Sequence, residues 1–269
     1  MRRSPAALAG VSLGDLTIDD ESSFRDIAIY GALKRSLTEG RYRFRVLGSP
    51  SNGRWDRALF LNLTFWNGRG GDVLAFDHLA ADVVAHVAWH HVAARALSRS
   101  SRAPLSADAL LLGEAIASAF DLYLVGRLLA TSSRAAFLET QVPAMADAAA
   151  AAGMSARAFE AMLRAVARDP AAAFEDLRAL LFDATTALVR CGGVADATRV
   201  LAKFDRHRFG ALLHHYELSN WVLFARAYAP DALGRDRAVR AVDCSLRRAD
   251  VALDWLAERW LPSTESLVT

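Results

Sequence analysis

Cysteine is scarce in this chain of 269 residues, which contains only Cys191 and Cys244. Two cysteines cannot build a disulfide framework, and neither has a nearby cysteine with which to form a thiolate zinc site. We therefore expect both to remain thiols in a reducing, cytoplasmic protein. No apolar run of about 18 residues is free of charges or histidines, so the sequence predicts no membrane span. The short, interrupted apolar stretch after the N-terminus predicts no secretory signal.

An excess of charge of one sign is also missing. The chain has 32 basic and 30 acidic residues, a formal net charge of +2, so nothing favours nucleic acid or an anionic membrane as a partner. Its 53% hydrophobic residues exclude disorder and are enough for a sizeable core. Glycine-rich phosphate loops, nucleophile elbows and Cys/His dyads are absent, which excludes the commonest nucleotide-binding and acyl-transfer sites.

The pattern along the chain predicts a mainly α fold, with a small N-terminal β-hairpin or sheet followed by a multi-helix bundle. We expect one domain over residues 1–269, with a loose leader at 1–20, a first helix at 24–37, a β region at 40–76 and a helical region at 77–261. The β region is expected to pair 42–47 with 58–66. Breaks at prolines and glycines divide the helical region into the expected helices near 77–99, 106–131, 134–151, 155–168, 171–190, 194–203, 206–228 and 231–260.

All seven histidines fall into two short clusters, at residues 78–91 and 207–215. On a helix, His86 and His90 lie one turn apart on one face, where both imidazoles can reach one ion, whereas His91 points away. Asp82 lies one turn before His86 and could orient it, and Trp89 lies between the two histidines and could shape a site. The alternatives are a metal-free, hydrogen-bonded core network and a scattered surface role for these histidines.

The next predicted helix carries two acidic residues, Glu114 and Asp121, on an otherwise apolar surface. Burying them is costly unless they meet a positive charge, which a metal ion at His86 and His90 would supply. Two histidines and one carboxylate are the ligands of many zinc sites and of the 2-His-1-carboxylate Fe(II) sites. The sequence therefore predicts one divalent ion, Fe(II) or zinc, held by His86, His90 and Glu114, with Asp121 supporting it from outside the ligand set.

A small sheet, a helix with His-x-x-x-His and a helix with Gly-Glu-x-x-Ala resemble the gluzincin metallopeptidases over roughly residues 55–130. The resemblance implies the ligands His86, His90 and Glu114. The family motif is His-Glu-x-x-His, in which the glutamate is the general base, but this chain has Val87 at that position. Peptide hydrolysis is therefore not the expected activity.

The segment around His86 and His90 is also similar, over a shorter stretch, to His-Glu-x-x-His proteins of peptide-modifying gene clusters. That resemblance implies hydroxylation of a peptide, and an Fe(II) oxygenase needs no general base beside its ligands. We therefore expect a non-heme Fe(II) oxygenase acting on a peptide or a small molecule. The alternatives are a zinc hydrolase and a non-catalytic binding module on a degenerate metallopeptidase scaffold.

The second cluster lies on the helix expected at 206–228. A continuous helix would place His207 and His214 two turns apart on one face, with Glu217 one turn beyond His214 and with His215 beside it. These residues could complete the site or contact a substrate at its mouth. The alternative is an amphipathic helix with partly exposed histidines. The oligomeric state is not predicted.

Overall fold

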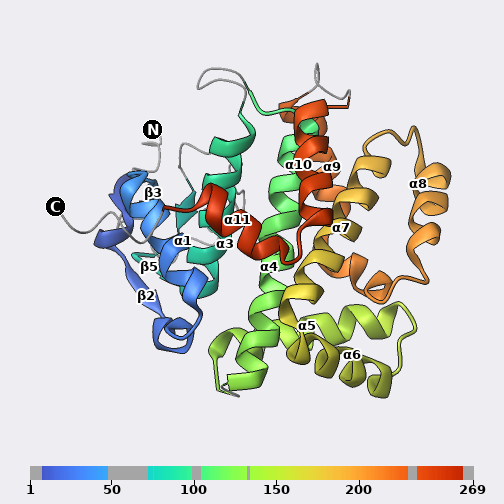
Figure 1. The fold of residues 1–269 in the computed structure, drawn as a ribbon, viewed down its shortest axis with the longest axis horizontal. Helices are drawn as coiled ribbons and strands as arrows, with labels where there is room; N and C mark the ends of the chain where they lie inside the picture. The colour runs from blue at the N-terminus through green and yellow to red at the C-terminus, as the bar shows by residue number, and fades with distance from the viewer. Residues whose placement is uncertain are drawn as a thin grey trace, which may run out of the picture. The chain divides into compact units, whose positions relative to one another are not determined.

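The computed structural model describes residues 8–47, 72–74, 76–98, 104–131, 134–229 and 235–262. The chain is mainly α, with short strands near its N-terminus, as the sequence predicts (Figure 1). It divides into two compact units, one formed by Met1–Val92 with Leu261–Thr269 and the other by Ala93–Trp260. The expectation of a single domain remains a prediction.

In the described residues of the first unit lie two small sheets, helix α1 and most of helix α3. Strand β3 (Arg43–Leu47) pairs antiparallel with β1 (Leu8–Ser12) and parallel with β4 (Val73–Leu74). The second sheet pairs β2 (Thr17–Asp19) parallel with β5 (His78–Ala80). Helix α1 (Ala28–Glu39) follows two short 3-10 helices, η1 (Leu13–Asp15) and η2 (Glu21–Phe24), and α3 (Ala81–Leu97) begins directly after β5.

Alternating burial explains strand β3. Phe44 and Val46 are buried, whereas Arg43 and Arg45 are exposed, as expected for a strand with one face on the core. Phe24, Leu33 and Leu37 are fully buried and belong to this core. Helix α1 is therefore held in place by one apolar face.

Two expectations for the N-terminal region need correction, and part of a third lies outside the described residues. The loose leader expected at 1–20 is wrong for residues 8–20, because β1 and β2 lie there, and residues 1–7 lie outside the described residues. The helix expected at 24–37 begins only at Ala28, after η2. The strand at 42–47 is confirmed as β3, but its predicted partner at 58–66 lies outside the described residues. Within the described part of the chain β3 pairs with β1 and β4 instead.

The second unit is built around one long helix, α4 (Ala107–Thr131), which contacts α5, α6, α7, α9 and α10. The helices in its described residues are α4, α5 (Ala136–Ala151), α6 (Ala156–Arg168), α7 (Pro170–Leu188), α8 (Val194–Leu201), α9 (Leu218–Tyr228), α10 (Arg237–Arg248) and α11 (Ala252–Trp260), with the 3-10 helices η4 (Ala202–Phe204) and η5 (Gly210–Tyr216). In Figure 1, α8 lies at the edge of this unit, and none of its residues is buried.

Local sequence signals set several of these helix ends. Gly153 has a φ of 84°, which glycine adopts without strain, and it follows α5. The Ser155 hydroxyl and the Asp169 carboxylate accept hydrogen bonds from the first turns of α6 and α7. Pro170 occupies the first position of α7, where no backbone N–H is needed. The predicted breaks at Gly153 and Pro170 are therefore confirmed.

Two predictions of long, continuous helices near the C-terminus are wrong. Residues 206–228 form η5 and α9, separated at Glu217, whose left-handed φ of 47° ends the 3-10 helix. Residues 231–260 are interrupted between α10 and α11, and 231–234 lie outside the described residues. Because the chain turns at Glu217, side chains before this residue do not share a helix face with side chains after it.

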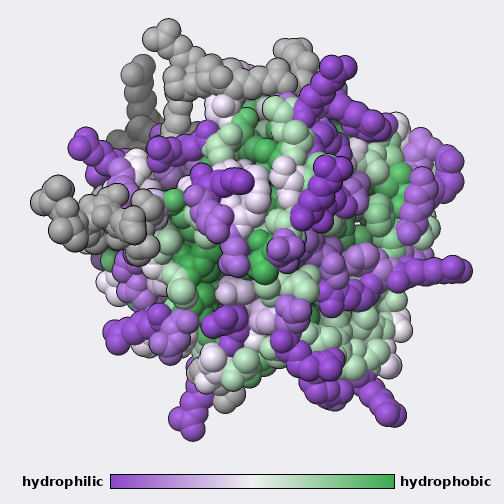
Figure 2. All heavy atoms as spheres, viewed as in Figure 1, coloured by the Kyte–Doolittle hydropathy of each residue, from purple (hydrophilic) through white to green (hydrophobic). Residues whose placement is uncertain are grey.

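Helix α4 is the one helix of the described chain that is long and apolar enough to cross a membrane by length and composition. Most of it is buried within the protein. Hydrophilic side chains cover much of the face shown in Figure 2, with smaller apolar areas between them.

A buried ion-pair network connects the helices around α4. The Arg178 guanidinium, fully buried on α7, donates to both oxygens of Glu175 at 2.7 Å and to Asp243 Oδ1 on α10 at 2.8 Å. At the start of α4, Asp108 accepts two hydrogen bonds from Arg240 at 2.9 and 3.0 Å. Paired charges of this kind are costly to break, because either partner alone would be a buried, uncompensated charge.

Candidate metal centre

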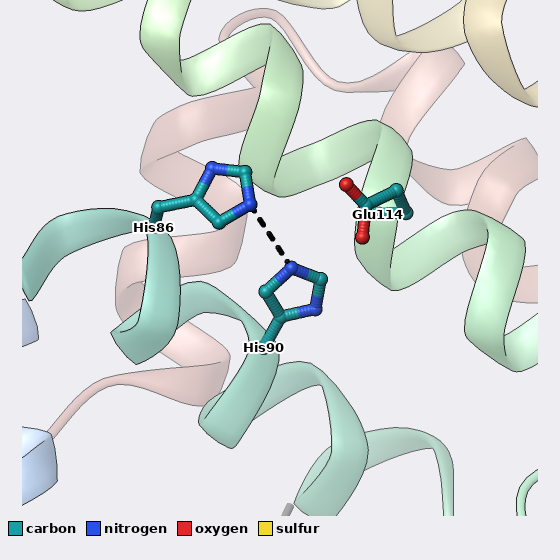
Figure 3. Close-up of side chains that lie close together, drawn as sticks. All are labelled: His86, His90 and Glu114. Carbon is teal, nitrogen blue, oxygen red and sulfur yellow. Dashed lines mark hydrogen bonds between the residues drawn. The ribbon is translucent and has the colours of Figure 1, made fainter. Parts of the chain in front are cut away.

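Helix α3 presents His86 and His90 side by side. The two residues are one helical turn apart, and their ring centroids are separated by 4.9 Å. Their Nε2 atoms lie 3.1 Å apart and face one another (Figure 3). Both side chains are half-buried, so the pair is accessible at one side. The predicted i, i+4 geometry on α3 is therefore present in the structure.

Glu114 comes from α4, where it is 6% exposed within a stretch of buried apolar residues. Its carboxylate points toward the two histidine rings (Figure 3). The Ser118 hydroxyl, one turn further along α4, donates to Glu114 Oε1 at 3.4 Å. Burying a carboxylate this deeply costs free energy, which a hydrogen bond or a nearby cation can offset.

Each of the three residues offers one ligand atom, and these atoms all lie within 4.8 Å of one another. Two nitrogens that each lie about 2.0 to 2.1 Å from one ion are separated by roughly 2.9 Å at a right angle and by roughly 3.4 Å at a tetrahedral angle. The observed 3.1 Å between the histidine nitrogens falls between these values. The group could therefore hold one metal ion, with the carboxylate moving inward to complete the set.

The three possible ligands limit which metals can bind but do not identify one metal. Two neutral imidazoles and one carboxylate suit zinc, and they also suit Fe(II) with open coordination positions for other ligands. Val87, between the two histidines in sequence, is buried and apolar. The position that carries the general base in a His-Glu-x-x-His protein therefore has no proton acceptor here.

The other residues of the α3 segment have different surroundings. Trp89 is fully buried, so it belongs to the core that supports α3. Burial raises the pKa of Tyr30, as do Glu21 and, to a smaller extent, Asp82, so the Asp82 carboxylate lies near α1. Asp82 is not part of the group of possible ligands.

His91 points away from the pair, as its position on the helix predicts. It is 4% exposed, and its ring lies edge-on to that of Tyr42 at a centroid distance of 5.3 Å. The Tyr42 hydroxyl in turn donates a hydrogen bond to Asp72. An added Cβ at Gly40 would overlap His91 Nε2, so glycine leaves the room that His91 occupies. Sequence reasoning missed this packing, because no local pattern connects Gly40 to His91.

The second histidine cluster does not have the predicted helical arrangement. His207 lies in a turn, where its Nδ1 accepts a hydrogen bond from the Phe209 N–H at 3.2 Å. His214 and His215 lie on η5, and His214 is exposed. Glu217 accepts a hydrogen bond from Asn220 Nδ2 at 2.6 Å, at the start of α9. The expected alignment of His207, His214 and Glu217 on one helix face is therefore wrong.

Asp121 acts electrostatically on the end of η5. Burial lowers the pKa of His215, and the nearby Asp121 carboxylate partly opposes that shift. Burial also raises the pKa of the Tyr216 hydroxyl, and Asp121 raises it further. Asp121 is on α4 two turns beyond Glu114, and it is not one of the three possible ligands. The structure thus places Asp121 with His215 and Tyr216.

Comparisons with known proteins do not add to this geometry. No protein-family model, no curated protein and no solved structure matches the chain.

Proposed function

We propose that this protein is a metal-dependent enzyme in which His86, His90 and Glu114 hold one divalent ion. The observation that supports the proposal best is the convergence of the two Nε2 atoms and a buried carboxylate within 4.8 Å. A metal-free alternative needs only hydrogen bonds among these groups. Metal content distinguishes the two, because only the metal centre requires an ion at this point.

We propose Fe(II) as the ion and an oxygenase as the class of enzyme. Two histidines and one carboxylate leave coordination positions for dioxygen and substrate, and such chemistry needs no general base at Val87. In the overall reaction, one atom of dioxygen enters a C–H bond of a peptide or small molecule. The other atom leaves as water, with two electrons from an organic co-reductant and two protons. The similarity to peptide-modifying proteins favours a biosynthetic role, and the free cysteines fit a reducing cytoplasm.

The proposal is tested by loading metal-free protein anaerobically with Fe(II) and adding nitric oxide, which occupies the position open to dioxygen. We expect the absorption and electron paramagnetic resonance signals of a ferrous nitrosyl complex. His90→Ala and Glu114→Ala should lose these signals. His78→Ala is the matched control, because His78 lies on β5 and contacts Asp19 at 2.6 Å, outside the ligand group. A wild-type protein that binds Fe(II) but gives no nitrosyl signal would refute an open iron site.

A peptidase assay tests the gluzincin resemblance separately. We expect zinc-loaded protein not to cleave generic peptides, because the buried Val87 cannot accept a proton from a metal-bound water. Val87→Glu should restore at most a trace of hydrolysis, since transition-state stabilisers are needed as well. Clear turnover by the wild-type zinc form, lost in Asp82→Asn or Asp121→Asn, would favour the zinc hydrolase instead. Protein that binds neither metal would favour a non-catalytic binding module.

A further inference from the structure

A buried serine follows Glu114 by one turn of α4. Glu114 and Ser118 are 6% and 4% exposed, and the residues between them on α4 are apolar and fully buried. The hydroxyl therefore has a restricted choice of partners. Its hydrogen bond runs to Glu114 Oε1 at 3.4 Å, between two side chains of the same helix.

Other buried hydroxyls in this protein behave differently. Ser36 donates to the Leu33 carbonyl, and Thr185 and Thr186 donate to carbonyls four residues earlier, all at 2.7 Å. Such bonds to the helix backbone are the usual solution for serine and threonine inside a helix. Ser118 is directed to the carboxylate instead, so its hydroxyl constrains a side chain rather than the backbone.

A hydrogen bond on one carboxylate oxygen favours coordination of a metal through the other oxygen. Such a one-oxygen ligand occupies a single coordination position, whereas a carboxylate bound through both oxygens would occupy two. Outer groups that orient metal ligands in this way typically change metal affinity by 10- to 100-fold when removed. Because 3.4 Å is long for an O–H···O hydrogen bond, we expect an effect near the lower limit.

We propose that Ser118 is a positioning residue that holds Glu114 Oε1, so that Oε2 alone binds the ion. This inference rests on the proposed metal centre. Ser118 would then act on the site without contacting the ion. With Glu114 bound through one oxygen, the coordination position that its second oxygen would occupy stays open.

The test compares metal affinity in variants at position 118, using Zn(II) with a competing chelator as the probe. Ser118→Ala should weaken binding about tenfold. Ser118→Thr and Ser118→Val have nearly the same shape, but only threonine keeps the hydroxyl, so Ser118→Thr should bind more tightly than Ser118→Val. Ser36→Ala is the matched control, since it also removes a buried serine hydroxyl but leaves the carboxylate untouched.

The Co(II)-substituted protein supplies a readout that a purely structural role would not change. If Ser118 orients Glu114, the visible absorption bands of Co(II) should shift in Ser118→Ala and Ser118→Val, and remain close to wild type in Ser118→Thr and Ser36→Ala. Equal affinities and spectra for Ser118→Thr and Ser118→Val would overturn the inference, even if Ser118→Ala failed to fold. If Glu114→Ala also binds like wild type, the metal centre itself fails. If only Glu114→Ala loses the ion, the failure concerns Ser118 alone.

Discussion

Replacing Gly40 by alanine tests the packing that supports the histidine helix. Gly40 follows α1 with an ordinary helical φ of −69°, so its backbone does not require glycine. The constraint comes from its neighbours: an added Cβ would overlap His91 Nε2 and lie 2.7 Å from the Ser36 carbonyl oxygen. Gly31, on the same helix, is the matched control, because its nearest neighbour would be the flexible end of Arg35 at 3.8 Å.

The two substitutions should have opposite effects on the free energy of unfolding. Forcing a methyl group into a filled site costs about 1–3 kcal/mol, so Gly40→Ala should be destabilising. At a helical position with free space, Gly→Ala stabilises by roughly 0.5–1 kcal/mol, so Gly31→Ala should be stabilising. At about 2–4 °C per kcal/mol, the melting temperature should fall by roughly 2–12 °C in Gly40→Ala and rise by roughly 1–4 °C in Gly31→Ala.

Thermal unfolding followed by circular dichroism, with a chelator present to exclude any metal contribution, measures both changes. Combining Gly40→Ala with His91→Ala should cost less than the sum of the single variants, because the second change removes one of the two obstructions. The coupling should lie in the range of about 0.5–3 kcal/mol found for contacting residues. Equal stability of Gly40→Ala and Gly31→Ala, or additive effects of Gly40→Ala and His91→Ala, would show that the His91 ring does not fill the space beside Gly40.

Three further predictions concern the histidines and the buried ion pairs. His91→Ala should lower the melting temperature but keep the bound metal, whereas His90→Ala should lose the metal; equal metal loss in both would contradict the geometry on α3. Because burial lowers the pKa of His215 below its value in the unfolded chain, the unfolded state takes up protons more readily, and stability should fall as the pH drops below about 6.5. His215→Gln should reduce that loss in pH-dependent unfolding, and an unchanged pH profile would exclude this role. Asp243→Ala should cost about 3 kcal/mol in urea unfolding, because it leaves the buried Arg178 with fewer acidic partners, and a cost below about 1 kcal/mol would show that this pair behaves like a surface pair.

Much of the helical region could be predicted because its signals are local. Helical periodicity with Gly153 and Pro170 at the breaks located α4 to α7, and the i, i+4 spacing alone placed His86 beside His90. Glu114 could be proposed from the cost of burying a carboxylate in an apolar helix. These inferences need only helix geometry and solvation, which a single sequence contains.

The remaining features depend on contacts between distant parts of the chain. Strand β1 forms at 8–12 because β3 pairs with it, and no signal within the first twenty residues predicts that partner. The left-handed turn at Glu217 lies within a segment of helical composition, so periodicity extended the helix through it. Ser118 is an intermediate case, because a serine four residues after a glutamate is visible in sequence, whereas its choice of the carboxylate over a backbone carbonyl is not.

The metal centre is tested most directly by the metal content of protein purified without chelators, measured by elemental analysis. We expect about one Fe or Zn per chain, almost none in His86→Ala, His90→Ala and Glu114→Ala, and an undiminished content in His78→Ala. Adding the ion back to metal-free wild type at 100 times its dissociation constant should stabilise it by about 2.7 kcal/mol. Metal-free wild-type protein whose unfolding ignores added Fe(II) and Zn(II) would contradict the metal centre and return these three residues to a hydrogen-bonded core network.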